Sequence, residues 1–305
     1  MSDQGVVPVA KHVELYYRVA GAGRSVVLVP SAAWLEADLE PLAQGRTVVF
    51  YDQRGRGRSD ADPSLTRVWT DYEVEDMEVI RETVDAERVA IVGWSYMGAV
   101  AALYASAYPD RVERLVLMCP IPPRSPAPYD DPQAAESRAD DRVPASARER
   151  LMELRDTGVE ATAPVEYCRE YYRVHIPRQM ANPQALDRMR SDPCRYPNEW
   201  PQNLAEHHRQ HFPPDSLVWD WREQVGNVQS PALIIHGMED LTPVEASREW
   251  ASSLPNAGLL ALPGVGHYPH LEAPTAFYGA VESFLGGEWP TDVEHYERAA
   301  LAGRG

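Results

Sequence analysis

The sequence predicts an α/β protein in which a mostly parallel sheet is flanked by helices and carries a helical insertion. Two observations support this prediction. Short apolar runs alternate with segments of helical periodicity, which is typical of parallel strands covered on both faces. The alternation then stops over residues 121–227 and resumes at residue 232, so this segment is expected to be a helical insertion that lies over the sheet.

Most of the expected strands are continuous apolar runs, as in strands that are buried on both faces. They cover residues 25–29, 46–51, 88–92, 114–118, 232–236 and 258–262. Residues 13–19 alternate between apolar and polar side chains, which indicates a strand with one exposed face. Helices are expected over 71–85, which has one apolar face, and over the Ala-rich run 98–107.

Residues 121–227 are expected to form a helical cap on a core made of residues 1–120 and 228–305. The segment is rich in Arg, Glu, Tyr and Pro, and helical patterns occur at 148–155, 165–174 and 203–211. Its aromatic residues either contact a substrate or only pack the cap onto the core: Tyr167, Tyr171, Tyr172, Trp200, Trp219 and Trp221. The chain beyond Gly286 is polar, with a short helix expected over 291–302.

The composition restricts the partners. Lys and Arg number 29 against 46 Asp and Glu, and the net charge of −17 disfavours nucleic acid and anionic membranes. The N-terminus lacks the features of a signal peptide, and no apolar run reaches the roughly 20 residues that span a bilayer. Cys119, Cys168 and Cys194 form no metal pattern, so reduced thiols and a cytoplasmic location are expected. The oligomeric state is not predicted.

Residues 89–103 carry the strongest motif. An apolar run ends at Gly93, Ser95 follows, and the Ala-rich helix begins near Gly98. Strand, Gly-x-Ser and helix form a nucleophile elbow, in which a sharp turn exposes the serine hydroxyl. The usual pattern has glycine where this chain has Met97, so we expect a narrowed elbow. The alternative is an ordinary strand-to-helix junction that contains a serine.

Two further residues complete a chemical hypothesis. Asp240 follows the strand 232–236, and His267 lies in a glycine-containing loop after the strand 258–262. The order serine, aspartate, histidine is the chain order of a catalytic triad on a parallel sheet. Glu239 is the alternative acid and His270 the alternative base.

Each residue type has its own chemical task. A serine hydroxyl is a weak nucleophile, so it needs a base within hydrogen-bond reach. Histidine titrates near neutrality and can take a proton and return it. A buried carboxylate fixes the imidazole tautomer and stabilises the imidazolium. Such a trio needs no metal and no organic cofactor, and none is expected.

The remaining histidines suggest no second centre. His236 ends a buried strand and is expected to be a core residue. His207 and His211 lie four apart on one helical face, a spacing that could bind a metal ion, but no third ligand accompanies them.

These stretches resemble the α/β-hydrolase superfamily over residues 13–285 and are most similar to proline iminopeptidase-like serine hydrolases. The likeness is carried by residues 50–59 (FYDQRGRGRS), 93–98 (GWSYMG), 235–240 (IHGMED) and 264–267 (GVGH), the last followed by LEAP. It implies that Ser95 is the nucleophile, Asp240 the acid and His267 the base, with the cap enclosing the substrate. Asp52 is expected to pair with an arginine and brace its loop.

The loop after the strand 25–29 departs from the family pattern. Such families carry His-Gly or His-Gly-Gly-Pro-Gly there, whereas this chain has Pro30-Ser31-Ala32-Ala33-Trp34. By position, the backbone N–H groups of Ala32 and Tyr96 would form the oxyanion hole. Because one donor is worth about 10²–10³ in rate, an altered loop predicts a slower or different reaction.

The resemblance and the motifs favour a serine hydrolase that cleaves an ester, lactone, thioester or amide of a small apolar substrate through an acyl-enzyme. The pocket is expected to be lined by Trp34, Trp94, Met97, Tyr171, Trp200 and Trp219. Three alternatives stay open. They are a carbon–carbon bond hydrolase or cyclase, an iminopeptidase whose Glu166, Glu170 or Glu206 holds a substrate amine, and a non-catalytic ligand-binding module.

Overall fold

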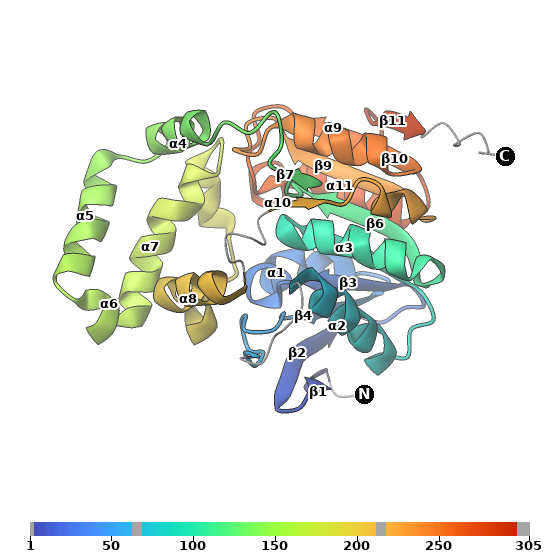
Figure 1. Ribbon diagram of the computed structural model, residues 1–305, viewed down its shortest axis with the longest axis horizontal. Coiled ribbons are helices and arrows are strands. Elements are labelled where there is room, and N and C mark those ends of the chain that lie inside the picture. Colours follow the sequence, from blue (N-terminus) through green and yellow to red (C-terminus); the bar gives the residue numbers. More distant parts are fainter. Residues whose placement is uncertain (1–2, 63–68, 212–217, 298–305) are drawn as a thin grey trace.

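The computed structural model describes residues 3–62, 69–211 and 218–297, and it confirms the α/β class (Figure 1). Among these residues a nine-stranded sheet has the order β1-β2-β4-β3-β5-β6-β9-β10-β11. Its interior, from β4 to β10, is parallel, whereas β1, β2 and β11 pair antiparallel at the two edges. The carboxyl ends of the interior strands therefore share one edge, where ligands bind in such sheets.

The interior strands lie where the apolar runs predict them. The strands of the large sheet are β1 Gln4–Ala10, β2 Val13–Ala20, β3 Val26–Pro30, β4 Thr47–Tyr51, β5 Val89–Trp94, β6 Val112–Met118, β9 Ala232–Gly237, β10 Asn256–Leu262 and β11 Glu294–Glu297. The helix expected over 291–302 is wrong for 294–297, which form β11, and residues 298–302 lie outside the described part. The sequence of β11 is polar and does not predict a strand. The segment is a strand because it pairs with β10, a contact that the local sequence does not reveal.

Helices cover both faces of the sheet. The core helices are α1 Ala32–Leu39, α2 Trp69–Thr83, α3 Tyr96–Ala107, α9 Val244–Ser253, α10 Pro269–Glu272 and α11 Pro274–Leu285, with the 3₁₀ turns η1 Glu40–Ala43 and η2 Pro109–Arg111. The turn η7 Gln224–Asn227 ends the segment between β6 and β9 and packs against α3. One apolar cluster gathers α1 and α11, and the other gathers α2, α3 and α9. Val27 and Val29 of β3 belong to the first cluster and Leu28 to the second, as the two-residue period of a strand requires.

The insertion, residues 121–227, joins β6 to β9. It contains α4 Pro132–Asp141, α5 Ala145–Asp156, α6 Val159–Thr162, α7 Pro164–Arg178, α8 Pro201–His211, the turns η3 Pro183–Arg188, η4 Pro193–Arg195 and η5 Pro197–Glu199, and the small ribbon β7 Arg124–Ser125 with β8 Trp219–Asp220. The predicted helices 148–155, 165–174 and 203–211 lie within α5, α7 and α8. Figure 1 shows these helices beside one end of the sheet, on the left.

The cysteines differ from expectation. Cys168 of α7 and Cys194 of η4 form a disulfide with their Cα atoms 5.7 Å apart, whereas Cys119 is a buried thiol. The expectation of three reduced thiols is therefore wrong for this pair. The two residues are 26 positions apart in sequence, and only the path of the insertion brings η4 against α7. The cytoplasmic location stays a prediction that has lost one of its supports.

Within the described ranges, no helix combines the length and the apolar character that crossing a bilayer requires.

Candidate active site

Ser95 occupies a strained turn between β5 and α3. Its φ of 54° and ψ of −123° lie in a region that residues with side chains rarely adopt. A Cβ added to Gly93 would lie 2.5 Å from the carbonyl oxygen of Met97, so this position requires glycine. Met97 itself packs in the core with 2% of its surface exposed. The turn at Ser95 thus forms with methionine at position 97, and the Met97 side chain packs into the core.

Replacing Gly93 by alanine is expected to lower the free energy of unfolding by about 1–3 kcal/mol, because the added methyl group meets rigid backbone. The measurement is urea unfolding. Gly279→Ala is the matched control, since a Cβ at Gly279 on α11 has nothing within 4 Å. That variant should be neutral or more stable by up to about 1 kcal/mol. Equal behaviour of the two variants would contradict the close approach at the elbow.

Asp240 and His267 form a buried pair. Oδ2 of Asp240 lies 2.7 Å from Nδ1 of His267, and Oδ1 accepts from the Thr242 amide at 3.1 Å. Burial raises the pKa of Asp240, but the charge and hydrogen bond of His267 outweigh it, and the net pKa lies below the usual value. Asp240 is therefore a carboxylate that can orient the imidazole.

Two hydrogen bonds and one close backbone contact hold the loop that carries His267. The His267 amide donates to the carbonyl oxygen of Gln179 at 2.9 Å. The indole Nε1 of Trp94, next to Ser95, donates to the carbonyl oxygen of His267 at 3.1 Å. A Cβ on Gly266 would lie 2.4 Å from the Gln179 carbonyl, so this close approach needs glycine. The elbow, the β10 loop and the insertion thus set the place of the imidazole together.

The alternative acid and base lie elsewhere. The Glu239 side chain is exposed. His270 is buried against Trp94 and Phe277, and burial lowers its pKa to about 3, so its ring is neutral at physiological pH. His236 is fully buried, with Nδ1 2.9 Å from Ser247 Oγ, as expected of a core histidine. The structure pairs Asp240, and not Glu239, with His267.

Ser95 and His267 line one cavity of about 330 Å³. It lies between the carboxyl ends of the interior strands and the insertion, because α7 and α8 supply part of its wall. Its aromatic and aliphatic lining comprises Trp34, Trp94, Met97, Tyr171, Tyr172, Ile176, Leu204 and Tyr268. Its polar lining comprises Ser31, Gln53, Arg56, Tyr96, His175, Gln179 and His208. Such a mixture suits a small molecule with apolar surface and a few polar groups.

Four of the six predicted pocket residues line this cavity: Trp34, Trp94, Met97 and Tyr171. Trp200 and Trp219 do not, contrary to the prediction. Trp200 donates through Nε1 to the carbonyl oxygen of Cys194 at 3.0 Å and packs against the α1 and α11 cluster. Trp219 donates to the carbonyl oxygen of Pro122 and stacks on Trp221 beside a different hollow. Both indoles pack the insertion.

The two expected oxyanion donors begin helices. Ala32 is the first residue of α1 and Tyr96 the first of α3, and the first N–H groups of a helix point out of its N-terminus. The next amide, that of Ala33, donates to Asp52 Oδ1 at 2.7 Å. Asp52 also accepts from Arg58 Nε at 2.8 Å, so it braces the start of α1, as expected for this loop residue.

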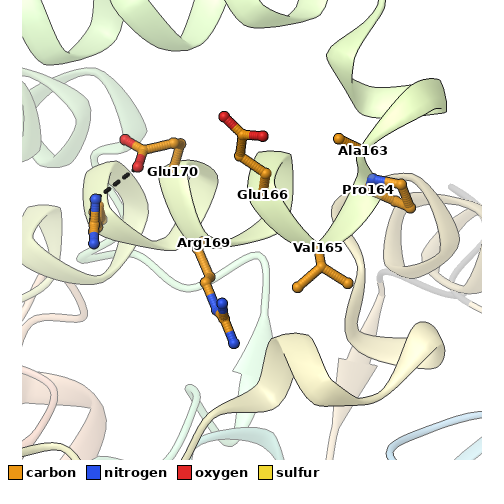
Figure 2. A pocket seen from close by; sticks show the side chains of 7 residues that line it. Ala163, Pro164, Val165, Glu166, Arg169 and Glu170 are labelled. Carbon is orange, nitrogen blue, oxygen red and sulfur yellow. Dashed lines mark hydrogen bonds and ion pairs between the residues drawn. The ribbon is translucent and has the colours of Figure 1, made fainter.

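The insertion carboxylates suggested as amine ligands do not line the cavity. Figure 2 shows Glu166 and Glu170 beside a separate hollow on α7, where Glu170 pairs with Arg173 at 2.6 Å. Glu206 pairs with Arg209 on α8. No described aspartate or glutamate is among the residues that line the cavity.

Several polar residues of the cavity were missed. Gln53 and Arg56 belong to the stretch 50–59 that carries the family likeness, but the likeness assigns neither of them a role. His175 and Gln179 lie one and two helical turns beyond Tyr171, so they share its face of α7, a spacing that could have found them. Glu199, fully buried at the end of η5, had no sequence pattern.

Three potential metal ligands lie close together in the core. Within the described part of the chain, Cys119, His236 and Asp240 have ligand atoms within 4.8 Å of one another, and all three are buried. Asp240 is already bonded to His267 and Thr242. His207 packs its ring on Trp69, and the side chain of His211 lies outside the described residues. These contacts give a metal site no support.

Comparison with known proteins agrees with the fold. The family model described as the alpha/beta hydrolase fold matches residues 30–274. A putative carbamate hydrolase of Caulobacter sp. is 29% identical, with 90% of this chain and 96% of that protein covered. The proline iminopeptidase of Heyndrickxia coagulans is 24% identical, with 87% and 91% covered.

Solved structures show the same fold. A meta-cleavage product hydrolase from Pseudomonas fluorescens superposes with a TM-score of 0.68 at 21% identity, covering 93% of this chain and 98% of that one. With the family match over most of its length and relatives named as hydrolases, the chain belongs to the α/β-hydrolase fold family and is a hydrolase.

Proposed function

We propose that the protein is a serine hydrolase that cleaves an ester, lactone, thioester, carbamate or amide bond of a small substrate through an acyl-enzyme. The observation that carries the proposal is the bonded pair of Asp240 and His267 on a cavity that Ser95 also lines from a strained elbow. The insertion acts as the cap of this cavity, since α7 and α8 close its wall.

The chemistry proceeds in two halves. His267 takes the proton of the Ser95 hydroxyl while Oγ attacks the substrate carbonyl carbon, and the developing oxyanion is held by the amides of Ala32 and Tyr96. The intermediate then expels the alcohol, thiol or amine, which receives the proton from His267. Water attacks the acyl-enzyme by the same route, and the acid product leaves with Ser95 restored. Asp240 stabilises the imidazolium in both halves.

The cavity lining weighs against the iminopeptidase alternative. A free substrate amine would be cationic at neutral pH and would need a carboxylate partner. None of the described residues lining the cavity is acidic. The relative that is 29% identical is named as a putative carbamate hydrolase, so carbamates belong among the substrates to be tested.

The test is covalent labelling combined with kinetics. A fluorophosphonate should label Ser95, and Ser95→Ala should lower kcat/KM for activated esters by about 10⁴-fold or more. Ser252→Ala, an exposed serine on α9, is the matched control and should keep full activity. Label on another residue, or ester turnover that survives Ser95→Ala, would exclude the proposal. Activity on a 1,3-dicarbonyl substrate without acyl-enzyme would instead favour carbon–carbon cleavage.

A further inference from the structure

The charged side chain on the cavity wall is a cation. Of the described residues that line the cavity, Arg56 is the only arginine or lysine, and none is an aspartate or glutamate. The chain as a whole carries a net charge of −17, so the interior cation contrasts with the rest of the molecule. The wall therefore offers a partner for a negative group on the substrate and none for a positive group.

Only part of the Arg56 guanidinium is engaged. Nε donates to Glu199 Oε1 at 3.0 Å, and Nη2 donates to Oε2 at 2.6 Å. Arginine has five N–H donors, so two on Nη1 and one on Nη2 remain. All hydrogen bonds of this guanidinium to described residues go to Glu199. The remaining donors form the end of the fork, the geometry that binds a carboxylate through two parallel hydrogen bonds.

Glu199 holds the fork in place. Its oxygens also accept from Trp34 Nε1 and from the Gly57 amide, each at 2.7 Å, so its acceptor sites are filled. Burial raises the pKa of Glu199, but the charge and hydrogen bonds of Arg56 outweigh it, and the net pKa lies below the usual value. Glu199 therefore stays ionised and fixes one side of the Arg56 guanidinium, and Arg56 is one of the residues that line the cavity.

Apart from Glu199, which lies behind Arg56, the neighbours of Arg56 on the cavity wall bring no negative charge. Gln53 is neutral and donates through Nε2 to Ser31 Oγ at 2.9 Å. Burial and the positive charge of Arg56 lower the pKa of His208, which keeps this imidazole neutral at pH 7. On the cavity wall itself an incoming carboxylate meets one cation and neutral groups, and Glu199 contacts that cation without lining the cavity.

Arg56 and the nucleophile lie at the same edge of the sheet but on different loops. Arg56 follows β4 and Ser95 follows β5, with β3 between them. Neighbouring strands lie about 4.8 Å apart, so the two strand ends are separated by about 10 Å. A substrate that reaches both must carry its two functional groups at opposite ends.

We propose that the substrate bears a carboxylate remote from the bond that is cleaved, and that the open end of the Arg56 guanidinium binds it. The inference rests on the serine hydrolase function proposed above and narrows the substrate to anionic acyl compounds, such as half-esters of long dicarboxylic acids.

The first test uses the unaltered protein. p-Nitrophenyl half-esters of dicarboxylic acids of increasing length are compared with neutral alkanoate esters of the same length, and a second series places the carboxylate on the alcohol side. For the longer members of one series, kcat/KM should exceed that of the neutral esters by tenfold or more, mainly through KM. The half-succinate should show no such preference, because it is too short to reach Arg56.

Variants then locate the contact. Arg56→Met combined with Glu199→Gln removes both charges and leaves no buried ion unpaired. In this double variant the ratio of anionic to neutral kcat/KM should fall to about one. Both kcat/KM values in the ratio come from the same variant, so a loss of activity that affects both esters equally leaves the ratio unchanged. Arg169→Met, an exposed arginine on α7 that pairs with Asp192, is the control and should keep the ratio of the unaltered protein.

Competitive inhibition of the unaltered protein by free dicarboxylates needs no variant and should follow the same length order. Hydrolysis of neutral esters with no anionic preference in either series overturns this inference and leaves the serine hydrolase intact. A preference that survives the double variant also overturns it. Failure of every ester, together with absence of Ser95 labelling, overturns the proposed function itself.

Discussion

Replacing Asp240 by asparagine is expected to lower kcat by about 10⁴-fold with little change in stability. The asparagine side chain has the same shape and keeps an oxygen for the Thr242 amide. Its NH₂ group would face Nδ1 of His267 and demand the tautomer in which Nδ1 accepts a hydrogen bond. In that tautomer Nε2 carries the proton and cannot take one from Ser95, so the general base is lost.

The measurement is kcat for an activated ester, with thermal unfolding to show that the variant is folded. Glu239→Gln removes the adjacent carboxylate, which is exposed, and should leave kcat unchanged. If Asp240→Asn keeps more than a tenth of kcat, Asp240 does not orient the base. If Glu239→Gln lowers kcat as strongly, the assignment of the acid is wrong.

The sequence was sufficient for the interior strands of the sheet and for the places of Asp240 and His267 because both depend on local signals. Interior strands are buried on both faces, so β3, β5 and β9 are apolar runs that need no knowledge of their partners. Asp240 and His267 each follow such a run, and parallel strands end at one edge of the sheet. Their proximity thus follows from topology.

What could not be predicted depends on contacts between distant segments. Glu199 meets Arg56 across 143 positions, and the path between them runs through irregular, proline-rich turns without periodicity. The neighbouring Trp200 was predicted to line the pocket. At the end of this 3₁₀ turn, however, Glu199 bonds to Arg56 whereas Trp200 bonds to the carbonyl oxygen of Cys194. The disulfide between Cys168 and Cys194 was missed for the same reason, since spacing carries no information about the fold of the insertion.

Glu73 is expected to make the protein less stable as the pH rises. It lies on α2, is 3% exposed, and accepts from Trp69 Nε1 at 2.7 Å. Burial raises its pKa to about 8, although hydrogen bonds from Tyr96 and Trp69 oppose the rise. In the unfolded chain a glutamate titrates near 4.3. Between these values the folded state keeps a proton that the unfolded state has lost, so stability falls with pH across this window and levels off above about 8.

Glu73→Gln removes this titration and keeps an acceptor for the Trp69 indole. One pKa unit corresponds to about 1.4 kcal/mol, so the variant should exceed the unaltered protein in unfolding free energy by about 3–5 kcal/mol at pH 9. Near pH 4.5 the two proteins should be equally stable. Urea unfolding at several pH values gives the difference, and Glu82→Gln, an exposed glutamate on the same helix, should show none.

The size of this effect matters because domains are stable by only about 5–15 kcal/mol. Glu73 also lies against the hydroxyl of Tyr96, whose amide is one of the two proposed oxyanion donors. Ionisation of Glu73 would therefore place a buried charge directly beneath the elbow, and loss of activity above pH 8 should accompany the loss of stability. A stability difference between Glu73→Gln and the unaltered protein that does not vary with pH would show that Glu73 is already ionised in the folded state at neutral pH.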